Sequence, residues 1–297
     1  MSALTEARYD KNEQCHSLQR QDRVITPAIV PNERAAGAAL WLQQAHEDGR
    51  PFTGLPPALA PRHDADAYTA QAAFVALLCQ RRATTIAGYK IALTSQAMRN
   101  LVGYGNSISG CLLADQVVSS GSVLRNAGYG RLAVEFEVAF RFGSTLPLDV
   151  AARDPDRAAL LPYLISAHAA IELVDDRHAV YSRLPQEIFT LAADNAWNAG
   201  LVLGPEAVGW KQADLGAMQG VARIDGVEVG RGHGRDILGH PLDALAWLVH
   251  HLAGRGITLC EGDVVTTGSM VATQFPRPGA RVDFEIDGLG AVHCEVC

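Results

Sequence analysis

No apolar run in this chain approaches the ~18 residues that a membrane-spanning helix requires. Residues 1–8 also lack the basic-then-apolar pattern of a secretory signal. Lysine and arginine form no basic block, and the formal net charge of −7 disfavours a nucleic-acid-binding surface. We therefore expect a cytoplasmic protein that binds neither membranes nor nucleic acid.

Cysteine is too scattered to indicate a disulfide framework, with six residues spread over the chain. Cys294 and Cys297 form a Cys-x-x-Cys pair in a strand-like segment, where a spacing of three sends side chains to opposite faces. No second Cys pair or suitably spaced His pair completes a zinc site. We interpret both cysteines as structural.

Length and composition allow one large domain or two small ones, since 48% of the 297 residues are hydrophobic. Residues 1–30 are polar and show no convincing period, which predicts a loose tail. Residues 31–85 are predicted to be helical, whereas short strands interrupted by glycines are expected over residues 86–297. This mixture without regular βαβ alternation indicates an α+β fold.

Local signals predict three helices. Asn32 suits the cap of a helix that ends near Gly49. A second helix begins at about Asp64. A third begins at Pro241, because proline is favoured at the first helical position.

The Asp225-Gly226 pair predicts the turn of a β-hairpin. The glycines of residues 230–234 follow this hairpin and are separated from the next helix by several residues. A phosphate loop would lead from a strand directly into a helix. We therefore interpret residues 230–234 as a flexible connector.

Two glutamates occupy alternate positions of a segment that otherwise has the composition of a buried strand, residues 134–140. Alternate residues of a strand share a face, so Glu135 and Glu137 stand together. The apolar side chains of the opposite face are Val134, Phe136, Val138, Phe140 and Phe142. An edge strand with its polar face in water would explain the pair. A divalent cation such as Mg²⁺ would instead allow both carboxylates to be buried.

Other polar residues also lie in apolar surroundings. Glu172 could add a third carboxylate for Mg²⁺ or Mn²⁺, and Lys90 could lie near a substrate carboxylate or enolate. Surface positions are the ordinary alternative for both side chains. Residues 262–269 run a strand into a Gly-Ser turn that is either an ordinary turn or a carboxylate site. We interpret His168, in an alanine-rich stretch predicted to be helical, as a packing residue.

An ordered set of short motifs extends from about Asn32 to the C-terminus. In chain order, these motifs are Asp66-Ala67-Tyr68 with Gln71, Gly88-Tyr89-Lys90-Ile91-Ala92-Leu93-Thr94-Ser95, Glu135-x-Glu137, Ile171-Glu172-Leu173-Val174-Asp175, Gly200-Leu201-Val202-Leu203-Gly204, Gly239-His240-Pro241-Leu242 and Gly262-Asp263-Val264-Val265-Thr266-Thr267-Gly268-Ser269. The set resembles the 2-keto-4-pentenoate hydratase / 4-oxalocrotonate decarboxylase family, a branch of the fumarylacetoacetate hydrolase superfamily.

The resemblance implies a mixed β roll of the fumarylacetoacetate hydrolase C-terminal type with a helical N-terminal portion. Residues 86–297 are then expected to form the metal-binding catalytic domain, and the chain to assemble into a homo-oligomer. The resemblance also implies that Glu135, Glu137 and Glu172 hold Mg²⁺ or Mn²⁺.

Four further residues carry roles implied by the same resemblance. Lys90 is expected to be catalytic, as a second cation near the enolate oxygen of the substrate. Asp115 is expected to be an acidic catalytic residue close to the substrate. Thr267 and Ser269 are expected to bind the substrate, with Ser269 helping to fix its carboxylate.

The implied activity is that of a metal-dependent lyase acting on a 2-oxo or 2-hydroxydienoic acid. We expect a hydratase that converts a 2-hydroxy-2,4-dienoate to a 4-hydroxy-2-oxo acid. A 4-oxalocrotonate-type decarboxylase is the alternative, because both reactions require a metal that stabilises an enolate. Hydrolytic cleavage of an acylpyruvate-type diketone ranks lower, because no histidine lies between Ile86 and Phe136. His178 or His233 would have to activate the water.

The chain departs from the family pattern near the expected site. Ala133 stands where relatives often have a basic residue, with Arg131 two positions earlier, and Trp197 stands where small residues are common. These changes are consistent with a substrate that has a specialised tail and belongs to a biosynthetic pathway rather than to the degradation of aromatic compounds. A non-catalytic partner of a related hydratase or decarboxylase is a further alternative, but the intact carboxylates and lysine argue against it.

Overall fold

The computed structural model describes residues 32–297. The predicted loose tail, residues 1–30, lies outside the described residues. Within residues 32–297, no helix is long and apolar enough to cross a membrane. The five cysteines of this part of the chain are free, with Cys294 buried and Cys297 exposed.

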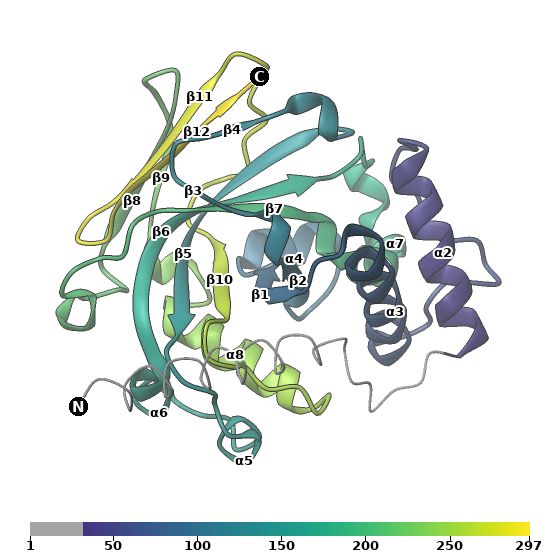
Figure 1. Ribbon diagram of the computed structural model, residues 1–297, viewed down its shortest axis with the longest axis horizontal. Coiled ribbons are helices and arrows are strands. Elements are labelled where there is room, and N and C mark those ends of the chain that lie inside the picture. Colours follow the sequence, from purple (N-terminus) through teal and green to yellow (C-terminus); the bar gives the residue numbers. More distant parts are fainter. Residues whose placement is uncertain (1–31) are drawn as a thin grey trace, which may run out of the picture.

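The strands form two sheets (Figure 1). The seven-stranded sheet has the order β2 (Ile108–Leu113), β1 (Ile86–Ala92), β10 (Val264–Ser269), β5 (Leu132–Phe142), β6 (Leu164–Asp175), β7 (Asn198–Leu203) and β3 (Val117–Ser119). The five-stranded sheet has the order β4 (Ser122–Leu124), β12 (Gly290–Val296), β11 (Arg281–Ile286), β8 (Gln219–Ile224) and β9 (Val227–His233). Mixed strand directions and the surrounding helices confirm the predicted α+β class.

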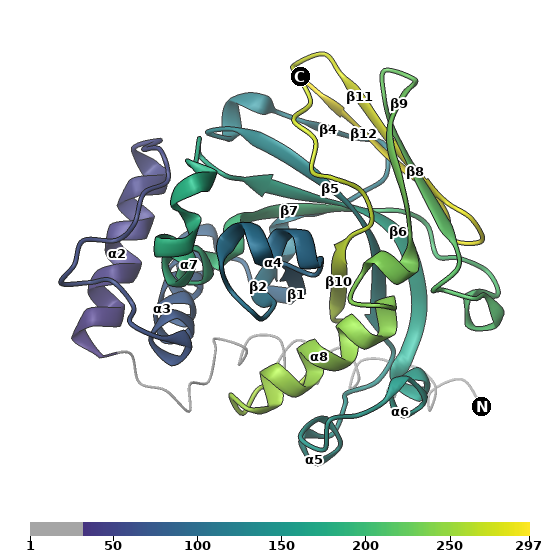
Figure 2. The same ribbon diagram turned by 180° about the vertical axis from the view of Figure 1, so that it is seen from behind.

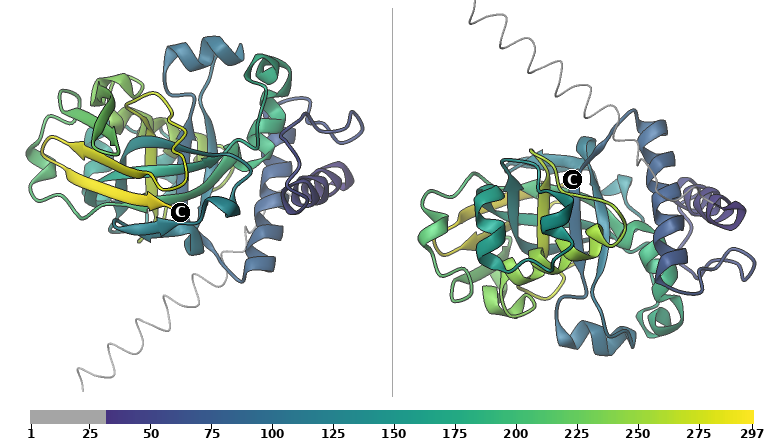
Figure 3. Two further views of the ribbon diagram at one scale, coloured as in Figure 1. Left: turned by 90° about the horizontal axis from the view of Figure 1, so that it is seen from above. Right: turned by 90° about the horizontal axis from the view of Figure 1, so that it is seen from below.

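Helices lie at the ends and along the sides of these sheets. The α-helices are α2 (Glu33–Glu47), α3 (Asp64–Arg82), α4 (Gln96–Val102), α5 (Leu148–Ala151), α6 (Arg157–Leu160), α7 (Leu184–Ala193) and α8 (Pro241–Ala253). Short 3₁₀ helices are η1 (Ala114–Gln116), η2 (Asn126–Gly128), η3 (Leu161–Tyr163), η4 (Tyr181–Arg183), η5 (Asn195–Trp197), η6 (Trp210–Gln212) and η7 (Gly234–Asp236). Helices α2 and α3 and the five-stranded sheet lie at opposite ends of the molecule (Figure 3).

The three predicted helices are confirmed, and side chains at their N-termini explain where they begin. The Asn32 side chain accepts the N–H of Ala35 at 2.9 Å at the start of α2. Helix α3 begins at Asp64, and α8 begins at Pro241 after His240. A buried cluster of mostly small side chains, with Leu42 and Phe74, joins α2 and α3 to α7.

The predicted hairpin is confirmed as β8 and β9, but the glycines after it were wrongly assigned to a flexible connector. Residues 230–233 belong to β9. A Cβ on Gly232 would lie 1.8 Å from the Met270 carbonyl oxygen, and one on Gly230 would lie 2.5 Å from the Val271 side chain. The missing side chains therefore let β9 approach the segment that follows β10.

Strands β5 and β6 are 11 and 12 residues long and pair along most of their length, so they exceed the short strands predicted. His168 lies in β6, and its predicted helical setting was wrong. Alanine favours helices locally, but pairing with β5 and β7 on both sides decides the conformation here. Burial lowers the pKa of His168, whose ring contacts Ser166 and the Gly204 carbonyl oxygen.

The two faces of β5 have different surroundings, as the alternation predicts. The apolar face lies in the main hydrophobic core, where Phe136 packs on Phe284 of the other sheet with 5.2 Å between ring centroids. Phe140 packs on Trp210 at 5.7 Å. The face that carries the glutamates points away from this core.

We expect Gly88→Ala to destabilise the protein by about 3 kcal/mol or more, because an added Cβ would overpack the junction of β1 with β10. Gly88 has φ of 153°, and a Cβ there would lie 1.8 Å from the Val264 carbonyl oxygen. Urea unfolding measures the loss. The matched control is Gly226→Ala. Gly226 has φ of 78°, but no atom lies within 4 Å of an added Cβ, so this variant should lose only about 1–2 kcal/mol of unfolding free energy. Equal losses would contradict the close strand approach.

Candidate metal centre and active site

Four adjacent strands of the seven-stranded sheet bring the predicted site together. In the order of the sheet, Lys90 lies on β1, Ser269 on β10, Glu135 and Glu137 on β5 and Glu172 on β6. The register places Glu135 opposite Glu172 and Ser269 opposite Glu137. The sheet therefore joins residues that are up to 179 positions apart in the sequence.

The three carboxylates converge. Glu135, Glu137 and Glu172 can each offer one oxygen atom within 4.8 Å of the others. Glu137 and Glu172 are fully buried, and Glu135 is half-buried. The Nζ of Lys90, itself buried, lies 3.0 Å from Oε1 of Glu172. Three acids and one ammonium group leave an excess of two negative charges when all four are ionised.

Neutral donors hold each carboxylate in place. The Thr273 hydroxyl donates to Glu135 at 2.7 Å, and the Gly268 N–H donates to Glu137 at 2.8 Å. The Asn198 side chain donates to Glu172 at 2.9 Å. Sequence reasoning missed Thr273 and Asn198, because a lone Thr or Asn carries no local signal for a carboxylate partner across the sheet.

Burial raises the pKa of Glu137 well above its usual value, and Glu172 and Glu135 add to the effect against the Gly268 N–H and Lys90. Burial likewise raises the pKa of Glu172, although Lys90 opposes the shift. For Lys90, burial lowers the pKa, but the three carboxylates outweigh it and the net pKa is raised. The carboxylates therefore favour the charged form of Lys90, but they need further positive charge to remain ionised together.

The donor set fits a divalent cation. Glu137 Oε1 and Glu172 Oε2 are buried and have no hydrogen-bond partner among residues 32–297. Unpaired buried carboxylate oxygens are costly. Hard cations such as Mg²⁺ and Mn²⁺ take oxygen ligands and keep several waters, so three carboxylates suffice.

The two predicted substrate-binding residues of β10 differ in their surroundings. Ser269 lines the cavity that also contains Lys90 and Glu135. Its hydroxyl accepts the Phe136 N–H at 2.8 Å and donates to the Val271 carbonyl oxygen at 2.7 Å. Thr267 is fully buried, and its hydroxyl donates to the Val138 carbonyl oxygen. The structure therefore places only Ser269 at the cavity.

The structure places Asp115 outside the cavity that Lys90 and Glu135 line. Asp115 is exposed in η1 and accepts from the Arg82 side chain of α3 at 2.8 Å. The motif position places Asp115 directly after β2, but the chain turns outward there and the carboxylate meets a cation on the surface.

The cavity has a volume of about 770 Å³, within the range of small-molecule sites. Lys90, Glu135 and Ser269 line it together with many apolar side chains. Helix α4 forms part of its lining and lies in front of β1 and β2 in Figure 2. Arg131 and Trp197, which lie in segments that depart from the family pattern, also line the cavity.

Comparison with known proteins identifies the family. The profile of the fumarylacetoacetate (FAA) hydrolase C-terminal family matches residues 108–297. 2-Keto-4-pentenoate hydratase 2 of Dechloromonas aromatica (strain RCB) is 33% identical over 256 residues, covering 86% of this chain and 94% of the relative. 4-Oxalocrotonate decarboxylase of Pseudomonas putida is 29% identical over 228 residues, covering 77% of this chain and 83% of the relative.

A solved structure shows the same fold. 4-Oxalocrotonate decarboxylase from Pseudomonas putida G7, in complex with magnesium and adipate, aligns with a TM-score of 0.79 at 23% identity, covering 92% of this chain and all of that one. The chain therefore belongs to the 2-keto-4-pentenoate hydratase / 4-oxalocrotonate decarboxylase branch of the fumarylacetoacetate hydrolase family, as predicted. The relatives in this branch are lyases.

We expect Glu137→Gln to weaken Mn²⁺ binding by on the order of 100-fold or more, because it removes one ionised ligand while keeping the shape of the side chain. Isothermal titration calorimetry of EDTA-stripped protein measures the affinity. Glu261→Gln, on the exposed loop before β10, is the matched control and should bind Mn²⁺ like the unchanged protein. Equal affinity of both variants would contradict the proposed ligands.

Proposed function

We propose that the chain is a metal-dependent hydratase that adds water to a 2-hydroxy-2,4-dienoate and yields a 4-hydroxy-2-oxo acid. The observation that carries this proposal is the convergence of Glu135, Glu137 and Glu172 beside buried Lys90, with Glu135 and Lys90 lining one cavity. Relatives named 2-keto-4-pentenoate hydratase support it.

Glu135, Glu137 and Glu172 would hold Mg²⁺ or Mn²⁺. When bound, the ion supplies a Lewis acid that polarises the 2-oxygen of the substrate. Magnesium in a structural neighbour supports this choice of metal.

Lys90 places a second positive charge in the same part of the cavity. Its pairing with Glu172 favours the charged form, so it would act as a cation and donor toward a developing enolate oxygen. Its contact with Glu172 fixes the ammonium group before the substrate arrives, so no reorganisation is needed. Ser269 would position the substrate carboxylate by turning its hydroxyl from the Val271 carbonyl oxygen to the substrate. The apolar walls lower the polarity around the site, which strengthens both interactions.

Decarboxylation of a 4-oxalocrotonate-type acid is the second candidate, because it requires the same stabilised enolate. The 29% identity to 4-oxalocrotonate decarboxylase favours it. Histidine-activated hydrolysis fits less well. His178 is exposed, and no histidine is among the described residues that line the cavity.

The assay that tests this proposal uses EDTA-stripped protein with Mg²⁺ or Mn²⁺ added back. We expect metal-dependent loss of the ultraviolet absorbance of 2-hydroxypenta-2,4-dienoate, with the hydroxy-oxo acid identified by mass spectrometry. Release of CO₂ from 4-oxalocrotonate, without hydration of the dienoate, would instead establish the decarboxylase. Absence of turnover by metal-loaded protein on both acids would count against a catalytic role.

Lys90→Met should lower kcat by about 100- to 1,000-fold while changing Mn²⁺ affinity much less, because it removes a donor to the developing charge. Lys211→Met is the matched control, since Lys211 is exposed and does not line the cavity, and its ammonium contacts the Leu161 carbonyl oxygen at 3.4 Å and lies 5.4 Å from the centroid of the Trp210 ring. Unchanged turnover in the Lys90 variant would remove Lys90 from the mechanism.

A further inference from the structure

The cavity continues well beyond the metal centre. Its volume of about 770 Å³ lies in the upper part of the range of small-molecule sites, roughly 300–1,000 Å³. A five-carbon acid held at Glu135 and Lys90 would leave most of this space empty. The residues that line the remaining space therefore indicate the chemistry of the substrate tail.

Much of the cavity is lined by apolar side chains. Met98 of α4, Val174 at the end of β6, and Leu184 and Leu191 of α7 all line it. These side chains come from three elements that share one buried cluster. An apolar group gains free energy in such surroundings in proportion to the area that it removes from water.

Trp197 adds an aromatic wall. It lines the cavity and packs edge-on against Phe52, with ring centroids 4.9 Å apart, and against Tyr181 at 6.0 Å. The indole is 6% exposed. Both neighbours hold the ring in one orientation, so Trp197 presents a fixed aromatic surface to a bound molecule.

The backbone that carries Trp197 is strained. Asn195, Ala196 and Trp197 are consecutive non-glycine residues with φ of 52°, 48° and 58°. This left-handed conformation costs free energy in each of them. The Asn195 side chain offsets part of this cost, because it accepts the Cys111 N–H at 2.7 Å and donates to the Cys111 carbonyl oxygen at 2.9 Å.

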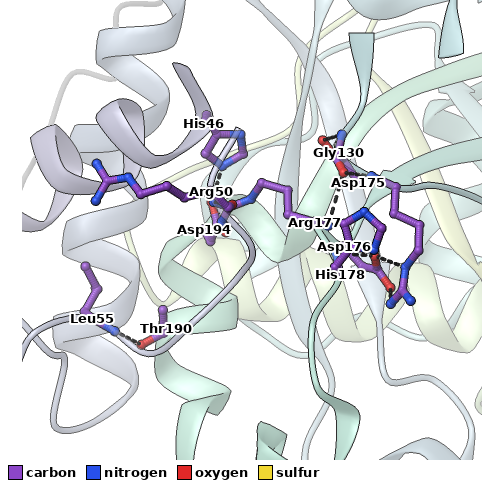
Figure 4. Close-up of polar contacts among 11 residues, drawn as sticks. His46, Arg50, Leu55, Gly130, Asp175, Asp176, Arg177, His178, Thr190 and Asp194 are labelled. Atoms are coloured by element: carbon purple, nitrogen blue, oxygen red, sulfur yellow. Dashed lines mark hydrogen bonds and ion pairs between the residues drawn. The ribbon is translucent and has the colours of Figure 1, made fainter. Parts of the chain in front are cut away.

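The residue before this turn is also fixed. Asp194 is fully buried and pairs with Arg177 and with His46 of α2, the latter at 2.6 Å (Figure 4). The Arg177 guanidinium in turn donates to the Arg50 carbonyl oxygen at 3.3 Å. An ion-pair network and a strained turn together hold Trp197 against the cavity, and maintained strain is typical of binding sites.

The charged residues of the cavity do not favour a second substrate carboxylate. Arg131 and Lys90 are the two cations among the described lining residues. Arg131 pairs with buried Asp176 through two nitrogens. Its guanidinium also lies 4.9 Å from the centroid of the Phe275 ring. Lys90 is paired with Glu172. A second carboxylate would therefore have to share a cation that is already paired with a protein carboxylate.

We infer that the substrate carries a single carboxylate, at the metal centre, and an uncharged apolar or aromatic tail that lies against Met98 and Trp197. This inference rests on the proposed function, because the metal centre orients the acid end. It distinguishes the chain from enzymes whose substrates are dicarboxylic acids.

Three dienoates with a common acid end test the inference: 2-hydroxypenta-2,4-dienoate and two longer analogues of equal length, one ending in a phenyl or alkyl group and one in a carboxylate. We expect kcat/KM to rise about fourfold per added apolar methylene, which corresponds to about 0.8 kcal/mol. The carboxylate-tailed analogue should be at least 100-fold poorer than its apolar counterpart. Equal or better use of the carboxylate-tailed or the unsubstituted acid would overturn the inference while leaving the hydratase proposal intact.

Binding measurements separate the two proposals. The saturated 2-oxo acids with the same three tails cannot react, so their Kd for Mn²⁺-loaded protein reports the cavity alone. The apolar tail should again bind at least 100-fold more tightly than the carboxylate tail. This preference without turnover of any dienoate would contradict the hydratase and retain the tail assignment, whereas equal Kd values would overturn the tail assignment.

A variant pair locates the tail. Met98→Arg adds a cation to the cavity and should shift the ratio of the two Kd values toward the carboxylate tail by at least tenfold. Leu101→Arg adds the same charge to the same helix at a side chain that is 47% exposed and does not line the cavity, and it should leave the ratio unchanged. An unchanged ratio in the Met98 variant, or an equal shift in both variants, would show that the tail does not lie along α4.

Discussion

Burial of three carboxylates beside a single lysine is the constraint on which this site depends. Glu137 and Glu172 are fully buried, and Lys90 neutralises only one of the three negative charges. Without another cation, burial and mutual repulsion drive proton uptake, as the raised pKa of Glu137 indicates. We interpret this cluster as a metal centre because a divalent ion balances the charge and accepts the unpaired oxygens.

The sheet makes this arrangement possible. Continuous pairing of β5 with β6 places Glu135 opposite Glu172, and parallel pairing of β1 with β10 places Lys90 beside them. Gly88 allows these two strands to meet closely, two residues from Lys90. The opposite face of β5 lies in the main core, so the packing that stabilises the fold also fixes the direction of the glutamates. Helices α4 and α7 then contribute to the cavity in which the substrate tail is proposed to lie.

Much of the fold and the main site could be predicted, because the signals are local or periodic. Alternation placed Glu135 and Glu137 on one face, and caps located the helices. Sequence order does not show that the chain turns outward after β2, where Asp115 meets Arg82. His168 was misassigned because alanine propensity ignores pairing on both sides of β6. The turn at Trp197 could not be foreseen, because left-handed non-glycine residues contradict local preference and depend on contacts far along the chain.

The most direct test of the metal centre is anomalous diffraction from crystals of the protein grown with Mn²⁺. The account predicts a manganese peak within ligand distance of carboxylate oxygens from Glu135, Glu137 and Glu172, with Lys90 still beside Glu172. A peak at other residues, or no peak at these carboxylates in crystals that contain the ion elsewhere, would contradict it.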